Sequence, residues 1–166
     1  MAKHKEEKTN VMRILAQKKL PYTAHSYEET ESPLGDRAYG LHIAQALGQD
    51  VSRVYKTLVA RGATGAHYVF CIPVAETLDL KKAAKAVGEK SVELIAVRDL
   101  LPLTGYVRGG CSPVGMKKQF PTVFHSAVTA HETVFVSAGR IGAQVELAPA
   151  ALLALLGADA ADIIVG

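Results

Sequence analysis

The chain has 166 residues, of which 49% are hydrophobic, 21% charged and 6% aromatic. This length and composition predict one globular domain over residues 1–166, with a flexible N-terminus at residues 1–8, and exclude a disordered chain, a collagen and a coiled coil. The richest apolar stretch, residues 148–156, is shorter than the ~20 residues of a membrane helix.

The charged residues at the N-terminus are not followed by the apolar stretch of a signal peptide, so we expect a cytoplasmic protein. The two cysteines, Cys71 and Cys111, fit that expectation, because a small exported domain more often carries several paired ones.

Positive charge is distributed unevenly along the chain. The formal net charge is +3, and all Lys and Arg residues except Arg140 lie at or before Lys118. Two interpretations stay open, a solvated surface or a basic face for a polyanion such as RNA. The residues of that face would be Arg53, Lys56, Lys81, Lys82, Lys85, Arg108, Lys117 and Lys118.

The first half of the chain predicts a helix that Thr9 or Asn10 caps and that ends before Pro21. A short strand over residues 22–27, a loop over 28–35 and a short helix over 41–47 ending at Gly48 follow. Residues 53–60 and 67–74 have the β-branched and aromatic content of two strands, which we expect to form a hairpin.

The second half predicts an amphipathic helix over residues 78–87 that ends at Gly88. Further elements are predicted as a strand over 92–97, a helical turn over 98–103, an irregular loop over 104–118, strands over 122–126, 133–137 and 143–147, and a helix over 149–156. Strands outnumber long helices and are joined partly by hairpins. The fold class is therefore predicted as α+β, a single domain with a mixed, barrel-like sheet surrounded by helices.

Few residues suggest metal or nucleophilic chemistry. The six histidines and two cysteines show neither HExxH nor CxxC spacing, so we expect no metal and no cofactor. Cys111 with His125 as base is a candidate for a cysteine hydrolase, but nothing in the sequence brings the two together, and an inert thiol is the simpler interpretation.

Two features remain as candidates for ligand binding. Gly109 and Gly110 can bring successive backbone N–H groups close to an oxyanion or a phosphate, although a tight turn explains them equally well. Lys56 has the same strand parity as the apolar Val54 and Leu58, so it either extends to the rim of the sheet or serves a polyanionic ligand in a cleft.

Taken together, several motifs resemble the YbaK/EbsC family, and in particular its YbaK branch of cysteinyl-tRNA(Pro) deacylases. The likeness runs in order from about Val11 to Ile164. The motifs are YKTL at residues 55–58, LKKAA at 80–84, TGYVRGGCSPVGMKK at 104–118, VSAGRIG at 136–142 and VELAP at 145–149. The family shares its fold with the editing insertion domain of bacterial prolyl-tRNA synthetases, which implies trans-editing of mischarged tRNA and prolyl-tRNA synthetase as a partner.

The resemblance also implies roles for individual residues. Lys56 matches the lysine placed at the terminal adenosine, and the loop that contains Gly109, Gly110 and Ser112 matches the one whose backbone holds the aminoacyl carbonyl. Further substrate-binding residues implied by the likeness are Tyr27, Tyr39, Thr57, Ser137 and Gln144. Some relatives carry an acidic residue at the position of Gln144.

The family's mechanism is substrate-assisted, since the cysteine thiolate of the substrate attacks its own ester carbonyl and releases a cyclic thiolactone. The resemblance implies removal of cysteine from cysteinyl-tRNA(Pro), with cysteinyl-tRNA(Cys) as a further candidate substrate. The alternatives are a deacylase for another mischarged tRNA, such as alanyl-tRNA(Pro), and a non-catalytic RNA-binding module of the same fold.

Overall fold

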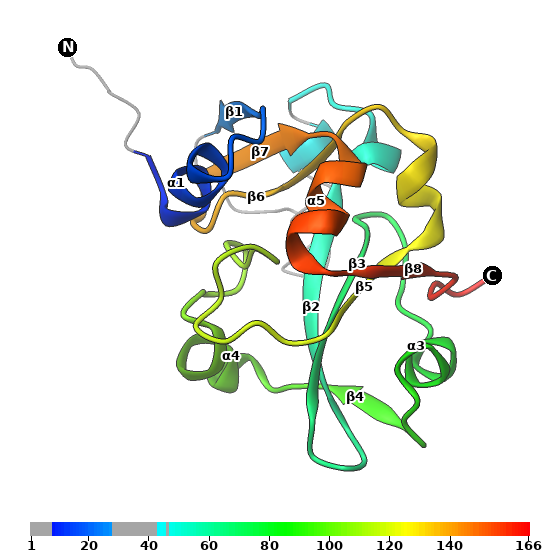
Figure 1. Ribbon diagram of the computed structural model, residues 1–166. Coiled ribbons are helices and arrows are strands. Elements are labelled where there is room, and N and C mark those ends of the chain that lie inside the picture. Colours follow the sequence, from blue (N-terminus) through cyan, green and yellow to red (C-terminus); the bar gives the residue numbers. More distant parts are fainter. Residues whose placement is uncertain (1–7, 28–42, 46) are drawn as a thin grey trace.

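A computed structural model describes residues 8–27, 43–45 and 47–166. The described strands form two sheets, one of three strands in the order β1-β7-β6 and one of five strands in the order β4-β2-β3-β5-β8 (Figure 1). The first sheet contains β1 (Thr23–Ser26), β6 (Val134–Ser137) and β7 (Ala143–Leu147). The second contains β2 (Tyr55–Gly62), β3 (His67–Pro73), β4 (Val92–Leu94), β5 (Thr122–His125) and β8 (Asp159–Ala161).

The β2–β3 hairpin forms the centre of the larger sheet. Its strands are antiparallel, with Lys56 opposite Ile72 and Thr57 opposite Cys71. β4 adds to β2 antiparallel, whereas β5 adds to β3 in parallel and β8 adds to β5 in parallel. The predicted hairpin and mixed sheet are therefore confirmed.

The two sheets meet where β2 begins. Val54 forms a parallel bridge with Phe135 of β6, and β2 packs along β6 beyond that point. A large apolar core lies between the sheets, and β2 contributes Tyr55 and Val59 to it. On the other face of β2, Leu58 and Ala60 pack with the helix that follows the hairpin. In the described part of the chain the sheets do not close into a barrel.

The helices lie on the outside of the sheets. They are α1 (Asn10–Gln17), α3 (Leu80–Val87), α4 (Val97–Thr104) and α5 (Pro149–Leu156), with 3₁₀ turns η2 (Val51–Arg53) and η3 (Ser126–Ala130). The Oγ1 of Thr9 accepts a hydrogen bond from the N–H of Met12 and caps α1, as predicted. Gly88 ends α3 with φ 74°, a left-handed conformation that glycine adopts without strain.

Most predicted elements are confirmed, and the bounds of β7 and α5 match the prediction. The prediction missed β8, a three-residue strand of Asp159, Ala160 and Ala161. The predicted loop over residues 28–35 lies outside the described residues, and of the predicted helix over 41–47 the described residues 43–45 are helical. Within the described chain, no helix has the length and apolar character needed to cross a membrane.

Candidate functional site

Lys56 is a half-buried cation at the start of β2. Its side chain shares a face with Val54, which packs against Phe135, and with Leu58, which packs toward α3. Burial lowers the pKa of the Lys56 ammonium, and the nearby Glu76 carboxylate opposes that shift. A partly desolvated cation of this kind interacts with an anionic ligand more strongly than a fully solvated lysine does.

Ser137 and Gln144 form a polar pair next to the strand that carries Lys56. They lie directly opposite each other in the β6–β7 ladder. An isolated parallel bridge between Val54 and Phe135 brings the start of β2, which carries Lys56, close to β6, which carries Ser137. The Oε1 of Gln144 accepts a hydrogen bond of 2.8 Å from the Nε2 of Gln49. This bond fixes the orientation of a polar side chain that is almost fully buried.

The glycine-rich loop packs against the turn of the β6–β7 hairpin. A Cβ added at Gly110 would lie 2.9 Å from the carbonyl carbon of Arg140 and 2.9 Å from the nitrogen of Ile141, so only glycine fits here. Gly109 has φ 88° and is exposed. The N–H of Gly110 donates to the carbonyl of Val107, so this N–H is part of a turn. Within the described residues the N–H of Gly109 has no hydrogen-bond partner, and the same holds for the N–H groups of Arg108, Cys111 and Ser112.

Tyr27 joins the same end of the three-stranded sheet. Its N–H donates to the carbonyl of Gly142 at 2.9 Å, which places the residue beside the turn that Gly110 contacts. The structure therefore brings together Tyr27, the glycine-rich loop and the β6–β7 hairpin, with Ser137 and Gln144 on the adjoining strands.

Thr57 lies on the other face of β2, and Ser112 is buried within the glycine-rich loop. The Oγ1 of Thr57 is 3.7 Å from the Sγ of Cys71, within the face that packs into the large core. Ser112 is fully buried, and its Oγ accepts a hydrogen bond from the N–H of Val114. Strand alternation thus separates Thr57 from its neighbour Lys56. Tyr39 lies outside the described residues.

Sequence reasoning missed a polar network on the outer face of the three-stranded sheet. The Glu146 carboxylate accepts hydrogen bonds from Thr133, His25 and Arg53, and these bonds lower its pKa, with Thr133 the largest cause. The Arg53 guanidinium also lies 5.0 Å from the centre of the Phe135 ring. The alternation of β7 puts Gln144 and Glu146 on one face, which was the available signal. The network fixes β1 and the start of β2 against β7.

Neither cysteine is placed as a nucleophile. Burial raises the pKa of the Cys111 thiol to about 12, and it raises that of Cys71 still further. The candidate base His125 accepts a bond from the N–H of Ile163 and lies on the face of β5 opposite Phe124, which packs into the core with Cys111. The cysteine-hydrolase hypothesis therefore has no geometric support. The described residues contain no group of three or more His, Cys, Asp or Glu side chains that could hold a metal ion.

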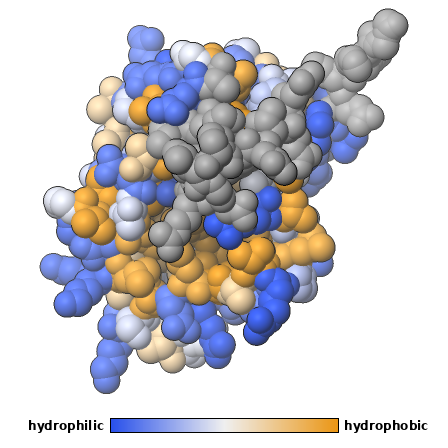
Figure 2. Space-filling view, turned by 180° about the vertical axis from the view of Figure 1, so that it is seen from behind, coloured by the Kyte–Doolittle hydropathy of each residue, from blue (hydrophilic) through white to orange (hydrophobic). Residues whose placement is uncertain are grey.

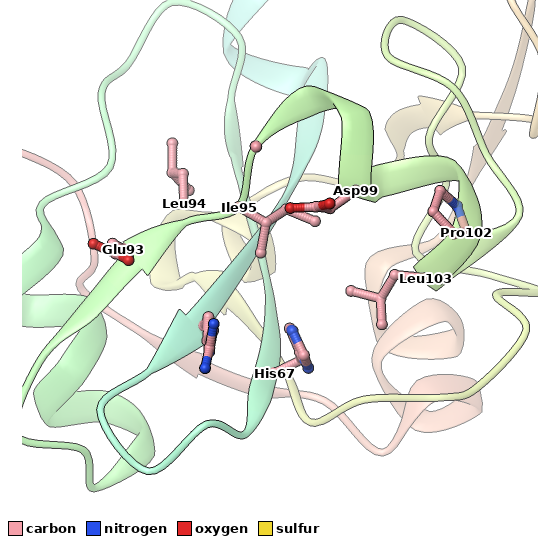
Figure 3. Close-up of a pocket in the computed structure, with 9 residues that line it drawn as sticks. His67, Glu93, Leu94, Ile95, Asp99, Pro102 and Leu103 are labelled. Carbon is pink, nitrogen blue, oxygen red and sulfur yellow. The ribbon is translucent and has the colours of Figure 1, made fainter.

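An open groove of about 660 Å³ lies at the far end of the β2–β3 hairpin. Figure 3 shows Glu93, Leu94 and Ile95 on one side of it and residues of α4 on the other. Arg61 of this groove is five residues along β2 from Lys56, about 16 Å at 3.3 Å per residue. None of the predicted site residues lines it. Figure 2 shows that apolar side chains also gather on the lower half of the rear face.

Comparison with protein families identifies the class to which this fold and this site belong. The model of the family described as "Aminoacyl-tRNA editing domain" matches residues 41–155, more than half of the chain. The chain belongs to this family. Its matched region contains Lys56, the glycine-rich loop and the β6–β7 hairpin.

Individual relatives agree with the family. A protein of Enterococcus faecalis named "Putative Cys-tRNA(Pro)/Cys-tRNA(Cys) deacylase EbsC" is 44% identical over 164 residues, which cover 98% of each chain. A crystal structure titled "a putative trans-editing enzyme for prolyl tRNA synthetase" has a TM-score of 0.75 at 26% identity, covering 94% of this chain and 97% of that one. The crystal structure of the hypothetical protein APE2540 has a TM-score of 0.82 at 24% identity, covering 93% of this chain and 99% of that one, and shares the fold.

The predicted family is confirmed, and with it the α+β editing-domain fold and the expected class of enzyme, an aminoacyl-tRNA deacylase. The substrate of this editing domain is therefore an aminoacylated tRNA. The roles of Lys56, Gly109, Gly110 and the substrate-binding residues stay predictions, although the structure gives the positions of those that it describes.

Proposed function

We propose that the protein removes cysteine from mischarged cysteinyl-tRNA(Pro) in the cytoplasm, as a trans-editing partner of prolyl-tRNA synthetase. The observation that carries the proposal is that, among the described residues, the site combines a half-buried cation with a glycine-rich loop, while both cysteines are buried. The full-length similarity to a protein named as a Cys-tRNA(Pro)/Cys-tRNA(Cys) deacylase supports the choice of substrate. The similarity to a structure titled as a trans-editing enzyme for prolyl-tRNA synthetase supports the choice of partner.

Such a site suits a reaction in which the substrate supplies the nucleophile. The thiolate of the esterified cysteine attacks its own carbonyl carbon, and negative charge develops on the carbonyl oxygen. The carbon–oxygen bond to the terminal ribose then breaks, the ribose oxygen takes up a proton, and a cyclic thiolactone leaves. Intramolecular attack has a high effective molarity, so the enzyme contributes orientation and charge stabilisation.

The proposed roles follow the positions of the residues. The Lys56 ammonium stabilises the phosphate and ribose end of the terminal adenosine and the charge that develops beside it. Gly109 and Gly110 form the wall at which the ester carbonyl approaches backbone N–H groups. Ser137 and Gln144 provide hydroxyl and amide groups next to Lys56, at the place where the aminoacyl end is held. Tyr27, whose N–H is bonded to the carbonyl of Gly142 in the hairpin turn, keeps the substrate-binding role that the resemblance implies.

Thr57 keeps in this proposal the contact with the aminoacyl end that the resemblance implies, although its Oγ1 lies on the other face of β2, 3.7 Å from the Sγ of Cys71. Ser112 contributes through its backbone, since its hydroxyl is already bonded to the N–H of Val114. Tyr39, which lies outside the described residues, keeps in this proposal the substrate-binding role that the family resemblance implies.

The test is to follow loss of the ester from cysteinyl-tRNA(Pro), from the same tRNA with its thiol alkylated, and from alanyl-tRNA(Pro). We expect rapid cleavage of the free-thiol substrate and background rates for the other two. Faster cleavage of alanyl-tRNA(Pro) would assign the enzyme to a different editing specificity. Binding of all three substrates without turnover of any would identify a non-catalytic RNA-binding module and refute the proposal.

A further inference from the structure

Two segments of the chain carry positive charge and no negative charge. Residues 8–27 contain four basic residues, Lys8, Arg13, Lys18 and Lys19, and residues 100–131 contain three, Arg108, Lys117 and Lys118. Neither segment contains an aspartate or a glutamate. Every one of these basic residues is exposed. The usual interleaving of charges on a protein surface is therefore missing from both segments.

The two segments lie against each other in the fold. The Cα of Gly115 faces α1 so closely that an added Cβ would lie 3.1 Å from the Cδ1 of Ile14 and 3.2 Å from the Nδ2 of Asn10. Arg13 lies about 100° from Ile14 around α1, and Lys18 follows the helix as its C-cap residue. The basic residues of the helix and of the loop consequently form one surface, which we call the α1–loop surface. Its members are Arg13 and Lys18 of the first segment, Arg108 and Lys117 of the loop, and Arg140 of the β6–β7 turn against which Gly110 packs.

Among the described residues, no carboxylate forms an ion pair with any member of the α1–loop surface. Other basic side chains differ in this respect. Lys82 of α3 bonds to Asp162 and to the carbonyls of Ile164 and Gly166, and Arg53 bonds to Glu146. Lys81 and Lys85 of α3 form no ion pair with a described carboxylate either, but their segment of the chain also carries Asp79 and Glu89, so its charge is mixed.

The α1–loop surface leads directly to the glycine-rich loop. Arg108 precedes Gly109 in the chain, and Gly110 packs against the backbone of Arg140. Figure 1 shows α1 on the same side of the molecule as this loop, whereas α3 lies on the opposite side. A polyanion bound along the surface would therefore have one end at the candidate site.

We propose that the α1–loop surface binds the phosphates of the tRNA acceptor stem and guides its 3′ end to the glycine-rich loop. The inference rests on the proposed function for the identity of the RNA. α1 is about 12 Å long at 1.5 Å per residue, and the loop extends the charged strip beyond the helix. A double-stranded stem presents closely spaced phosphates along such a strip, and basic side chains that neutralise them release counterions.

The test compares charge reversals on two helices of the full-length protein. Arg13→Glu with Lys18→Glu alters the α1–loop surface, and Lys81→Glu with Lys85→Glu on α3 is the matched control with the same change of net charge. Affinity for uncharged tRNA(Pro) is measured by fluorescence anisotropy from about 50 to 200 mM salt. We expect the α1 variant to bind at least tenfold more weakly at low salt, with a salt dependence shallower by about one to two ion equivalents, and the α3 variant to bind within about twofold of wild type.

A second measurement separates stem binding from the chemistry of the site. The α1 variant should lose kcat/KM on aminoacyl-tRNA but keep the wild-type rate on an aminoacylated CCA trinucleotide, which lacks the stem. Equal losses for the α1 and α3 variants, or no loss for either, would overturn the proposal. Because the anisotropy measurement uses uncharged tRNA, failure of the proposed cysteine specificity would leave its result unchanged and so can be told apart. Thermal melting of both variants checks that each is folded.

Discussion

The close contact between Gly110 and the β6–β7 turn allows a quantitative prediction for Gly110→Ala. An added Cβ would lie 2.9–3.0 Å from three backbone atoms of Arg140 and Ile141, whereas ordinary contacts begin at 3.4 Å. Backbone atoms do not rotate away, so the loop or the hairpin turn must move by roughly 0.5 Å. Misplacement by about 1 Å lowers the rate of a positioned reaction by about 100-fold, so we expect a tenfold to 100-fold loss of kcat.

The assay is single-turnover deacylation of cysteinyl-tRNA(Pro), combined with thermal melting. Overpacking of this kind also costs about 1–3 kcal/mol of stability, so the melting temperature should fall by several degrees. Gly65→Ala is the matched control, because Gly65 has φ +93° in the β2–β3 turn and no atom within 4 Å of an added Cβ. It should lower stability by about 1–2 kcal/mol and leave kcat within twofold. A Gly110→Ala enzyme with wild-type rate and melting temperature would refute the reasoning.

Three further predictions concern titratable groups. Burial lowers the pKa of Lys56, so the rate should fall on the alkaline side at a pH below the 10.5 of a free lysine. Lys56→Arg should extend activity to higher pH because the guanidinium stays protonated, and Lys56→Ala should lose about 100-fold or more in kcat without unfolding. A pH profile that is identical in Lys56→Arg and wild type would contradict this role. Burial raises the pKa of Cys111 to about 12, so the native thiol should react slowly with iodoacetamide at pH 8. Cys111→Ala should keep kcat within a few-fold of wild type. Complete loss of activity in a folded Cys111→Ala enzyme would restore the cysteine-hydrolase hypothesis. Hydrogen bonds lower the pKa of Glu146 below 4.5, so the stability that it contributes is present above pH 4.5 and is lost as the pH falls. In urea unfolding between pH 6 and 3, the free energy of unfolding should therefore fall less for Glu146→Gln than for wild type. Parallel curves would argue against this network.

Local patterns in the sequence were sufficient to predict most elements. The hairpin of β2 and β3, the amphipathic α3 and the start of α5 at Pro149 all follow from residue type, periodicity and capping. The strand β8 escaped prediction because Asp159, Ala160 and Ala161 have little intrinsic strand preference, and its pairing with β5 determines its conformation.

The arrangement of the site depended on contacts between distant segments. The sequence singled out Lys56 by its parity among apolar neighbours, and the structure confirms that shared face. The bridge between Val54 and Phe135 brings the start of β2 close to β6, and no local pattern encodes a pairing across about 80 residues. The three hydrogen bonds that the Glu146 carboxylate accepts were equally unpredictable from the sequence, since they depend on how β1 and the start of β2 lie against β7.

The central claim is that the substrate's own thiol carries out the attack on the ester. The most direct measurement compares single-turnover rates on cysteinyl-tRNA(Pro) and seryl-tRNA(Pro), which differ in one atom and place nearly equal demands on the size of the pocket. The account predicts cleavage of the cysteine ester at least about 1,000-fold faster, because a difference in binding of ~1–3 kcal/mol explains only about 10–200-fold. Equal rates on the two esters would contradict the account and would indicate attack by water.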